Sequence, residues 1–217
     1  MTRPRSLVHG VGVNDLGYNI SQLTQEGKQI LCPFYATWRR MIRRCYSEKD
    51  LLEHPTYVGK YVCDEWLSAT NFKAWMKKQH WEGLDLDKDV LVMNNTVYSP
   101  ETCAFIPQKL NKILLYKREK GDFPTGVTLR SNPNNWNLAK MYKSQVEKFN
   151  GGKATRYFYT AKEAHQSWQI EKANQIEIAV AWYGKQDCFR SDVAEALTQR
   201  VWKLRLDSGL GLETESL

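Results

Sequence analysis

Residues 84–112 combine an alternating apolar and polar pattern, an asparagine-rich segment, and a segment with helical spacing that opens at Pro107. Alternation is typical of a β-strand with one buried face, asparagine favours turns, and proline suits the first turn of a helix. The expected order is therefore strand, loop and helix. The strand carries Asp85, Asp87 and Asp89 at alternate positions, so we expect their carboxylates on one face.

Asparagine side chains accompany these acids. Asn94 and Asn95 lie in the expected loop, and Asn111 lies on the expected helix. A small ββα unit that brings a carboxylate and amides together is how a one-metal nuclease site is built, and oxygen ligands of this kind suit Mg²⁺. The competing interpretation is a solvated strand edge, which explains the acids but not the asparagines at these places.

The stretch resembles the core of the HNH (His-Me finger) nucleases in the form found in bacteriophage homing endonucleases, where L-D-x-x-D and then G-N-Y-x-P-x-N-C is typical. The upstream runs W-R-R-M-I-R-R-C-Y, V-C-D-E-W and N-F-K-A-W are similar to the helix-strand-helix lead of that family. The resemblance covers residues 32–112. It implies an α+β fold with a ββα-metal (HNH-like) domain behind a helical lead, and metal-dependent hydrolysis of phosphodiester bonds in duplex DNA.

The motif of the family implies a role for each matching residue. Asp87 matches the metal-binding carboxylate, and Asn111 matches the second metal ligand. Asn94 or Asn95 matches the middle asparagine, which orients the general base. Lys88 stands where the family has its general-base histidine. The implied cofactor is Mg²⁺ or another divalent cation.

Lys88 departs from the pattern of the family. A free lysine has a pKa of about 10.4, so it is protonated at neutral pH and is better suited to holding a phosphate than to accepting a proton. Either cleavage persists with metal-bound water, His80 or an aspartate supplying the base, or the unit is a catalytically silent HNH fold that acts as a DNA-binding or regulatory protein. A third hypothesis is an inhibitor of a host protein that reuses the fold.

The formal net charge of +7 over 217 residues favours a polyanionic partner, and double-stranded DNA is the partner that the resemblance implies. A helix expected over residues 33–46 has an apolar stripe for burial, made of Tyr35, Trp38, Met41, Ile42 and Cys45. Its other face carries candidate phosphate-binding arginines, Arg39, Arg40, Arg43 and Arg44.

After Gly121 the pattern predicts strands at residues 126–130, 136–143 and 155–159, separated by turns. Thr160 and Glu163 form a predicted capping box that opens a helix extending to residue 183. The runs G-V-T-L, N-W-N-L-A-K and R-Y-F-Y-T-A-K-E-A-H-Q-S-W resemble the plant APETALA2 type of DNA-binding domain. The implied fold is a small three-stranded antiparallel sheet plus a helix.

Such a sheet would lie in the major groove and read base edges from its open face. The candidate DNA-binding residues of this domain are Arg130, Trp136, Lys140, Lys143 and Arg156. Which of them face outward depends on the strand parity, and the alternation around Trp136 leaves that parity open.

Cys45, Cys63 and Cys103 stand where the phage family tends to have cysteine. With Cys32 or His54 as a fourth ligand they could hold a structural Zn²⁺, although no close C-x-x-C pair is present. The alternative is a set of small buried thiols.

The expected organisation is an N-terminal arm (1–31), an HNH-like nuclease domain (32–120), an APETALA2-like DNA-binding domain (121–184), and a C-terminal helix with an acidic tail (185–217). The last helix, with Ser191 as its cap, is expected either to pack on the preceding domain or to form a homodimer, and the tail from Asp207 is expected to fray. No run approaches the ~18 apolar residues of a membrane span, and the first residues lack the apolar core of a signal peptide. We therefore expect no membrane partner and a cytoplasmic protein, in the host cytoplasm if it is phage-encoded.

Overall fold

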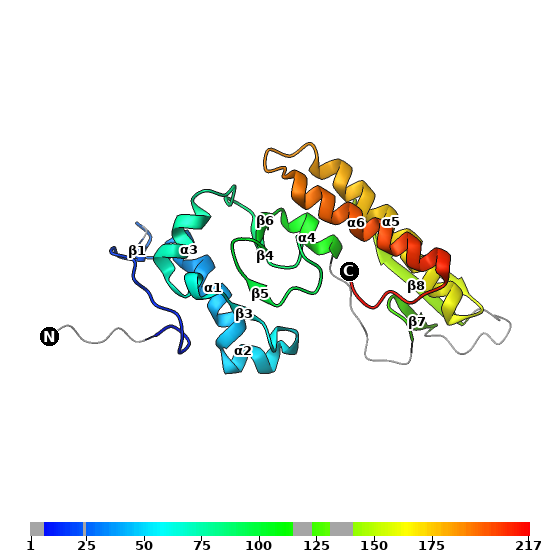
Figure 1. Cartoon of the computed structure of the whole chain (residues 1–217), viewed down its shortest axis with the longest axis horizontal. Coiled ribbons are helices and arrows are strands. Elements are labelled where there is room, and N and C mark those ends of the chain that lie inside the picture. The colour runs from blue at the N-terminus through cyan, green and yellow to red at the C-terminus, as the bar shows by residue number, and fades with distance from the viewer. Residues whose placement is uncertain (1–6, 24, 115–122, 131–140) are drawn as a thin grey trace. The chain divides into compact units, whose positions relative to one another are not determined.

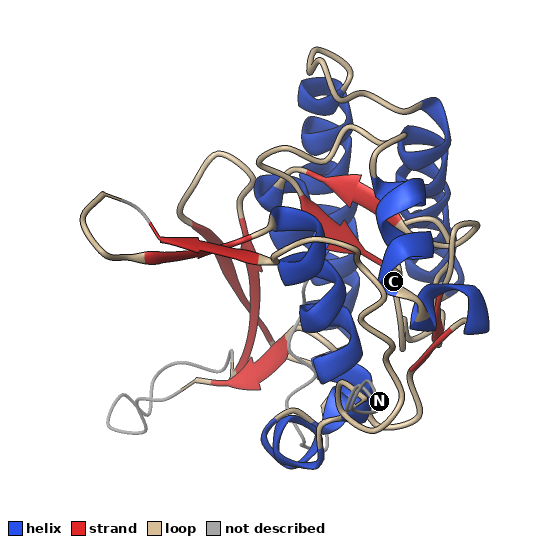
Figure 2. Ribbon diagram, turned by 90° about the vertical axis from the view of Figure 1, so that its left-hand side faces the viewer, coloured by secondary structure: helices blue, strands red, loops and turns tan. Residues whose placement is uncertain are grey.

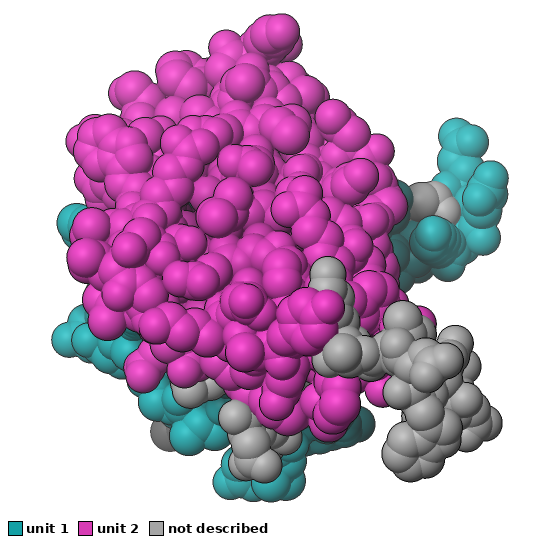
Figure 3. Space-filling model, turned by 90° about the vertical axis from the view of Figure 1, so that its right-hand side faces the viewer, with its two compact units in different colours: residues 1–105 teal, residues 106–217 magenta. Residues whose placement is uncertain are grey.

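The computed structural model describes residues 7–23, 25–114, 123–130 and 141–217. The chain forms two compact units, residues 1–105 and 106–217, which Figure 3 shows in different colours. The fold is mixed α and β, with helices and several small sheets. None of the described helices combines the length and the apolar character that a membrane span requires.

The first unit consists of short strands around a helical centre (Figure 1). Its elements are β1 (Ser21–Leu23), β2 (Gln29–Leu31), α1 (Pro33–Tyr46), α2 (Glu48–Glu53), η1 (Pro55–Tyr57), β3 (Tyr61–Val62), η2 (Asp64–Leu67), α3 (Ala69–Met76), β4 (Asp85–Asp87), β5 (Val97–Tyr98) and β6 (Ala104–Ile106). β1 pairs with β2, β3 pairs with β5 in parallel, and β4 pairs with β6.

Helix α1 confirms the bounds and the buried stripe expected from the sequence. Trp38 lies at the centre of the core, fully buried, and its indole nitrogen donates a hydrogen bond to the carbonyl of Trp66 at 2.8 Å. Trp66 in turn contacts Phe72 edge-on and Trp75, with ring centroids 5.1 Å and 4.5 Å away. The aromatic core therefore holds α1, η2 and α3 together, as apolar burial requires.

Strand β4 is shorter than the sequence predicts. It ends at Asp87, so Asp85 and Asp87 share a strand whereas Asp89 lies beyond its end. The expectation that all three carboxylates lie on one face of a strand is wrong for Asp89. The reason is local, because the backbone turns immediately after Asp87.

The second unit begins at Ile106, the last residue of β6. Its elements are α4 (Gln108–Leu114), β7 (Val127–Leu129), β8 (Tyr142–Glu147), β9 (Lys153–Phe158), α5 (Ala161–Tyr183) and α6 (Ser191–Leu210). The antiparallel sheet β7-β8-β9 and the long helix α5, which packs on it, confirm the expected three strands plus a helix (Figure 2). Within the described residues the second strand starts at Tyr142, and residues 136–140 of the predicted strand lie outside the description.

Helix α5 starts as predicted. The Thr160 hydroxyl accepts from the backbone of Glu163, and the Glu163 carboxylate accepts from the backbone of Thr160, which completes the capping box. Its buried face includes Trp168 and Ile176, whereas Ile170 is 48% exposed.

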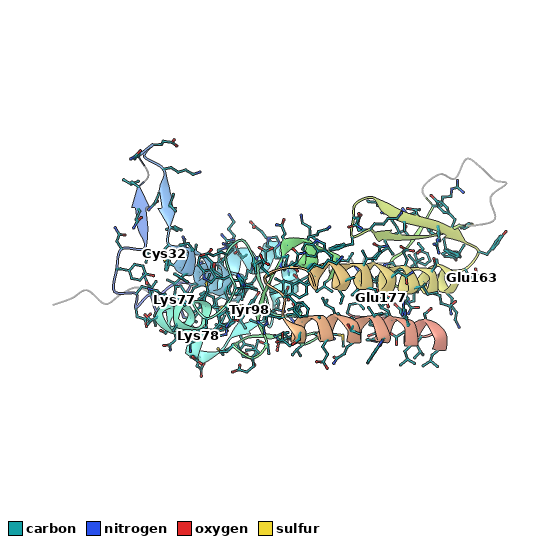
Figure 4. All side chains as sticks on the ribbon, turned by 90° about the horizontal axis from the view of Figure 1, so that it is seen from above. Cys32, Lys77, Lys78, Tyr98, Glu163 and Glu177 are labelled. Carbon is teal, nitrogen blue, oxygen red and sulfur yellow. The ribbon has the colours of Figure 1, made fainter. Side chains whose placement is uncertain are left out.

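Helix α6 packs along α5 and buries Val193, Leu197, Val201 and Leu204, which confirms the expected packing on the preceding domain. The two helices lie side by side (Figure 4), and Arg205 pairs with Glu177 across them at 2.7 Å. Ser191 is the first helical residue and Arg190 is the cap, so the expected serine cap is wrong by one position.

The segment after α6 is held down rather than frayed. Thr214 is 1% exposed, and its hydroxyl donates to Asp207 at 2.7 Å. The backbone N–H of Thr214 donates to Nε2 of His165 at 3.0 Å, and the Gln169 amide donates to the Thr214 hydroxyl at 2.9 Å. The expectation of a frayed tail from Asp207 is therefore wrong, because helix α6 continues to Leu210 and a buried threonine follows it.

Candidate functional site

The turn after β4 is built on the side chain of Asp87. Its Oδ1 accepts hydrogen bonds from the backbone N–H groups of Asp89 at 2.8 Å and Val90 at 2.6 Å. Aspartate is suited to this role because its short carboxylate reaches backbone donors two and three residues ahead. The other carboxylate oxygen makes no hydrogen bond to any described residue, which leaves it available as an acceptor or ligand.

Lys88 points into the protein and not into solvent. Its side chain is 5% exposed, and its ammonium donates to both carboxylate oxygens of Asp89 at 2.6 Å and to the backbone carbonyl of Asn95 at 2.9 Å. A lysine ammonium has three N–H donors, so protein acceptors satisfy all of them. In this geometry Lys88 is a cation that joins the two ends of the loop.

Asn95, and not Asn94, is the asparagine that organises the loop around Lys88. The Asn95 amide donates to the carbonyls of Lys88, at 2.8 Å, and Val97, and its oxygen accepts from the backbone of Val97 at 3.2 Å. Asn94 is exposed and has a φ of 58°, a left-handed conformation that asparagine tolerates better than most residues. Of the two asparagines that the sequence left open, Asn95 is the one whose side chain bonds the backbone of Lys88 and Val97.

Burial dominates the electrostatics of this loop. Burial raises the pKa of Asp87, and the nearby charge of Asp89 raises it further, while the hydrogen bonds from the backbone of Asp89 and Val90 act in the opposite direction. Burial also raises the pKa of Cys45 to about 11 and that of Cys103 to about 12, even though the positive charge of Lys88 acts against both shifts. Both thiols are therefore protonated at neutral pH.

The cationic face of α1 divides into paired and unpaired arginines. Arg43 forms an ion pair with Asp50 at 2.7 Å. Arg44 is turned inward, where it hydrogen-bonds Tyr98 and lies 5.8 Å from the ring centroid of Tyr57. Arg39 and Arg40 are exposed and, within the described chain, pair with no acidic side chain, so they remain the candidates for phosphate contact.

The predicted zinc ligands include two buried thiols. Cys45 and Cys103 are buried and Cys63 is half-buried, all as free cysteines. The described residues contain no group of three or more histidine, cysteine, aspartate or glutamate side chains arranged to hold a metal ion. The described residues therefore give no geometric support to the predicted zinc site. Cys45 and Cys103 are small buried thiols, as the alternative interpretation expects.

Asn111 lies on α4, in the second unit. Its backbone N–H donates to the carbonyl of Pro107 at 3.0 Å, and its side-chain amide makes no hydrogen bond to any described residue. The amide oxygen is thus free to bind a cation, as the carboxylate of Asp87 is in the first unit.

The register of the three-stranded sheet settles which predicted reader residues share a face. Thr128 and Tyr157 both lie opposite Lys143, and the Arg130 guanidinium lies 4.9 Å from the centroid of the Tyr157 ring. Residues directly opposite each other in an antiparallel sheet point to the same face. Arg130, Lys143 and Tyr157 therefore share the face that points away from α5.

Arg156 belongs to the other face. It lies opposite Ser144, which is buried against α5, and its guanidinium is 3.7 Å from Glu171 of that helix. Trp136 and Lys140 lie outside the described residues. Of the five predicted readers, the open face of the described sheet therefore carries Arg130 and Lys143.

Sequence reasoning missed Lys60 and Tyr157. Lys60 donates to the same carbonyl of Asn95 that Lys88 uses, at 3.2 Å, although it is distant in sequence. The parallel pairing of β3 with β5 brings the two together, and strands of two residues give too weak a pattern to predict that pairing.

Comparison with known proteins gives this chain no relative. No protein-family model, no curated protein and no solved structure matches it.

Proposed function

We propose that this chain is a DNA-binding protein of the HNH homing endonuclease type, which hydrolyses phosphodiester bonds in duplex DNA with a divalent cation. The observation that carries the proposal is the loop after β4. There Asp87 has a free carboxylate oxygen, and Asn95 and Lys88 hold the loop that follows. Strand β6, which pairs with β4, leads into α4, and α4 carries Asn111.

In this proposal the residues of the chain hold and orient the reacting groups. Asp87 would hold a divalent cation of the Mg²⁺ type, and the resemblance implies Asn111 as the second ligand, since carboxylate and amide oxygens fit the preference of this ion for hard ligands. The bound cation would supply an acidified water and stabilise charge on the scissile phosphate. Asn95 fixes the loop through its hydrogen bonds, and Arg39 and Arg40 would contact the phosphate backbone.

A second function is favoured by one specific observation, the complete satisfaction of the Lys88 ammonium by Asp89 and Asn95. A lysine bound in this way is a donor and cannot accept a proton from water. The base would then have to be another group, and without one the protein is a silent HNH-type fold that binds duplex DNA and regulates it. The open sheet face with Arg130 and Lys143 serves either function.

Incubation with supercoiled plasmid separates the two functions. The protein is incubated with Mg²⁺ or Mn²⁺, or with chelator, beside the Asp87→Ala and Asn111→Ala variants. Glu82→Ala serves as a matched control, because Glu82 is an exposed acid near β4. Metal-dependent nicking that survives in Glu82→Ala and disappears in the other two variants supports the nuclease.

Retardation of DNA without nicking, on plasmid and on phage genomic DNA, supports the silent binder instead. No retardation and no nicking on either DNA contradicts both functions. Binding should weaken steeply with salt, because contacts to phosphates release counterions.

A further inference from the structure

Helix α6 has a second apolar stripe, on the face turned away from α5. Trp202, Leu206 and Leu210 follow one another at a spacing of four residues, which places them in one line along the helix. They are 66%, 62% and 63% exposed. Helix α5 packs on the sheet and α6 packs on α5, so α6 is the outer layer (Figure 4). Such a line of large apolar side chains, here called the outer stripe, is typical of an interaction surface.

The charged residues on either side of the outer stripe are already paired. Lys203 pairs with Asp207 at 2.7 Å within α6, and Arg205 pairs with Glu177 of α5 at 2.7 Å. The stripe itself carries no charge, although the chain has a formal net charge of +7. A polyanion such as DNA therefore finds no cation within the stripe, whereas a second copy of the chain meets little charge repulsion there.

Gly209 opens a hole beside the two leucines of the stripe. A Cβ built on Gly209 would have no side chain and no other segment of the described chain within 4 Å. Residues spaced i, i+3 and i+4 on a helix frame a hole for a side chain of a facing helix, and Leu206, Gly209 and Leu210 have this spacing.

The large side chain that would fill this hole lies one turn earlier on the same helix. In an antiparallel pair of α6 helices, related by a twofold axis near Leu206, Trp202 of each copy reaches the hole of the other. The outer stripe is therefore complementary to itself, as an interface between two identical copies requires.

The area of the stripe is sufficient for a dimer of moderate affinity. Its three side chains expose on the order of 400 Å² per copy, so two copies would bury about 800 Å² from these side chains alone. Gln199 and the stems of Lys203 and Arg205 flank the stripe and raise the total toward the ~1,000 Å² of a specific interface. An interface at this end of the size range is expected to have a micromolar dissociation constant.

We propose that the outer stripe of α6 binds the outer stripe of a second copy of this chain. The two helices pair antiparallel, with Trp202 of each copy in the hole that Leu206, Gly209 and Leu210 of the other copy form. The homodimer goes beyond the proposed function and does not rest on it, because α6 contains neither Asp87 nor any residue of the sheet. Packing on α5 uses the other face of α6, so the helix serves both roles.

The test is sedimentation equilibrium of the full chain in chelator and without DNA. Loading from about 1 µM to about 0.2 mM spans the affinity expected of this interface. We expect the wild type to pass from monomer to dimer in this range, with little dependence on salt, because the contact is apolar. The double variant Trp202→Gln/Leu206→Gln should raise the dissociation constant at least about tenfold, since two large side chains lose their contacts. Circular dichroism verifies that the variant folds.

The matched control is Leu52→Gln/Val58→Gln, which changes two apolar side chains of the first unit that are 83% and 64% exposed. It should leave the dissociation constant within about twofold of the wild type. Gly209→Leu tests the shape of the stripe. It adds apolar surface, which would strengthen an unspecific association, but it fills the hole and should raise the dissociation constant about tenfold.

A wild type that stays monomeric throughout the range overturns the proposal. Equal weakening by the two double variants, or tighter association of Gly209→Leu, overturns it as well. The measurement uses neither DNA nor a divalent cation, so its outcome is independent of the nicking assay. Asp87→Ala should accordingly dimerise like the wild type, whether or not it nicks plasmid.

Discussion

The loop after β4 and the groove of the second unit, whose lining includes α4, β8 and the segment before β7, both contain lysines but use them in opposite ways. Lys88 is buried and donates to Asp89 and Asn95, so groups within the protein neutralise its charge and satisfy its N–H donors. Lys112 and Lys148 of the groove are exposed, with no ion pair in the described chain. The comparison teaches that a count of basic residues says little about nucleic acid contact until their burial and partners are known, because only unpaired cations release counterions when DNA binds.

The largest effect on stability that would test this comparison is at Asn95. Replacing Asn95 by Ala removes side-chain hydrogen bonds to the buried backbone of Lys88 and Val97, and should lower the free energy of unfolding by about 3 kcal/mol. Urea denaturation measures the change. Asn94→Gly is the matched control and should change stability by less than about 1 kcal/mol, since glycine accepts the φ of 58°. Equal losses in both variants would show that Asn95 does not organise the loop.

The next largest change in stability has the opposite sign and is expected at Lys172, in the groove of the second unit. Lys172 is 4% exposed, and burial lowers its pKa from the ordinary value to about 8, against the nearby charge of Glu147. Below pH 8 the lysine is protonated in both states, and the folded state carries the full cost of the buried charge. Lys172→Met should therefore raise stability at pH 7 by about 2 kcal/mol.

The pH dependence sharpens this prediction. The gain from Lys172→Met should shrink as the pH rises from about 8 toward the unfolded pKa of about 10.4, because the folded state is neutral above pH 8 and no longer carries the buried charge. Chemical denaturation of the wild type and the variant at pH 7 and pH 9.5 measures it. A gain that is independent of pH would contradict a cost due to charge.

Removing the buried ammonium of the loop should have a smaller effect, in the destabilising direction. Lys88→Met deprives Asp89 and the carbonyl of Asn95 of a donor, but Asp89 is half exposed and Lys60 still donates to that carbonyl. We expect a loss of about 1 kcal/mol by urea denaturation. Stabilisation by Lys88→Met, as predicted for Lys172→Met, would abolish the contrast between the two regions.

The smallest effect on stability is expected when low pH protonates His165, which hydrogen-bonds the segment before β7. Burial lowers the pKa of His165, against the hydrogen bond with Thr125 and the charges of Glu213 and Asp207. Its neutral ring donates to the Thr125 carbonyl through Nδ1 and accepts the N–H of Thr214 through Nε2, and protonation removes that acceptor.

Because the folded-state pKa of His165 is depressed, its contribution to stability is complete above the unfolded pKa of about 6.5. That contribution is lost as the pH falls through the folded value. Hydrogen exchange, corrected for the intrinsic effect of pH, should show less protection of the Thr214 amide at pH 5 than at pH 7.5. Protection of the Tyr61 amide is the internal control, since it donates to the backbone carbonyl of Thr96 at 2.9 Å and that acceptor does not titrate. Unchanged protection at Thr214 would place the titration elsewhere.

Sequence alone predicted the elements whose pattern is long and periodic. The bounds and the buried face of α1 followed from helical spacing, and the start of α5 followed from its capping box. The short strand β4 was overestimated, because the Asp87 carboxylate captures the backbone N–H groups that would have continued it. The choice between Asn94 and Asn95 was likewise inaccessible, since adjacent identical residues differ only in the backbone conformation that the fold imposes.

The sequence by itself determined three things, because composition and periodicity are local properties. These are the identities of the polar groups in residues 84–112, the surplus of cations, and the division into a helical lead and a three-stranded sheet. The tertiary structure alone decided that Lys88 is buried against Asp89 and that Lys60 reaches the same loop. It also placed Arg130 and Lys143 on the open face of the sheet, with Arg156 on the other, and gathered lysines from α4, β8, β9 and α5 around one groove. The physical reason is that the availability of a charge depends on the partners and the solvent around it, and both come from segments distant in sequence.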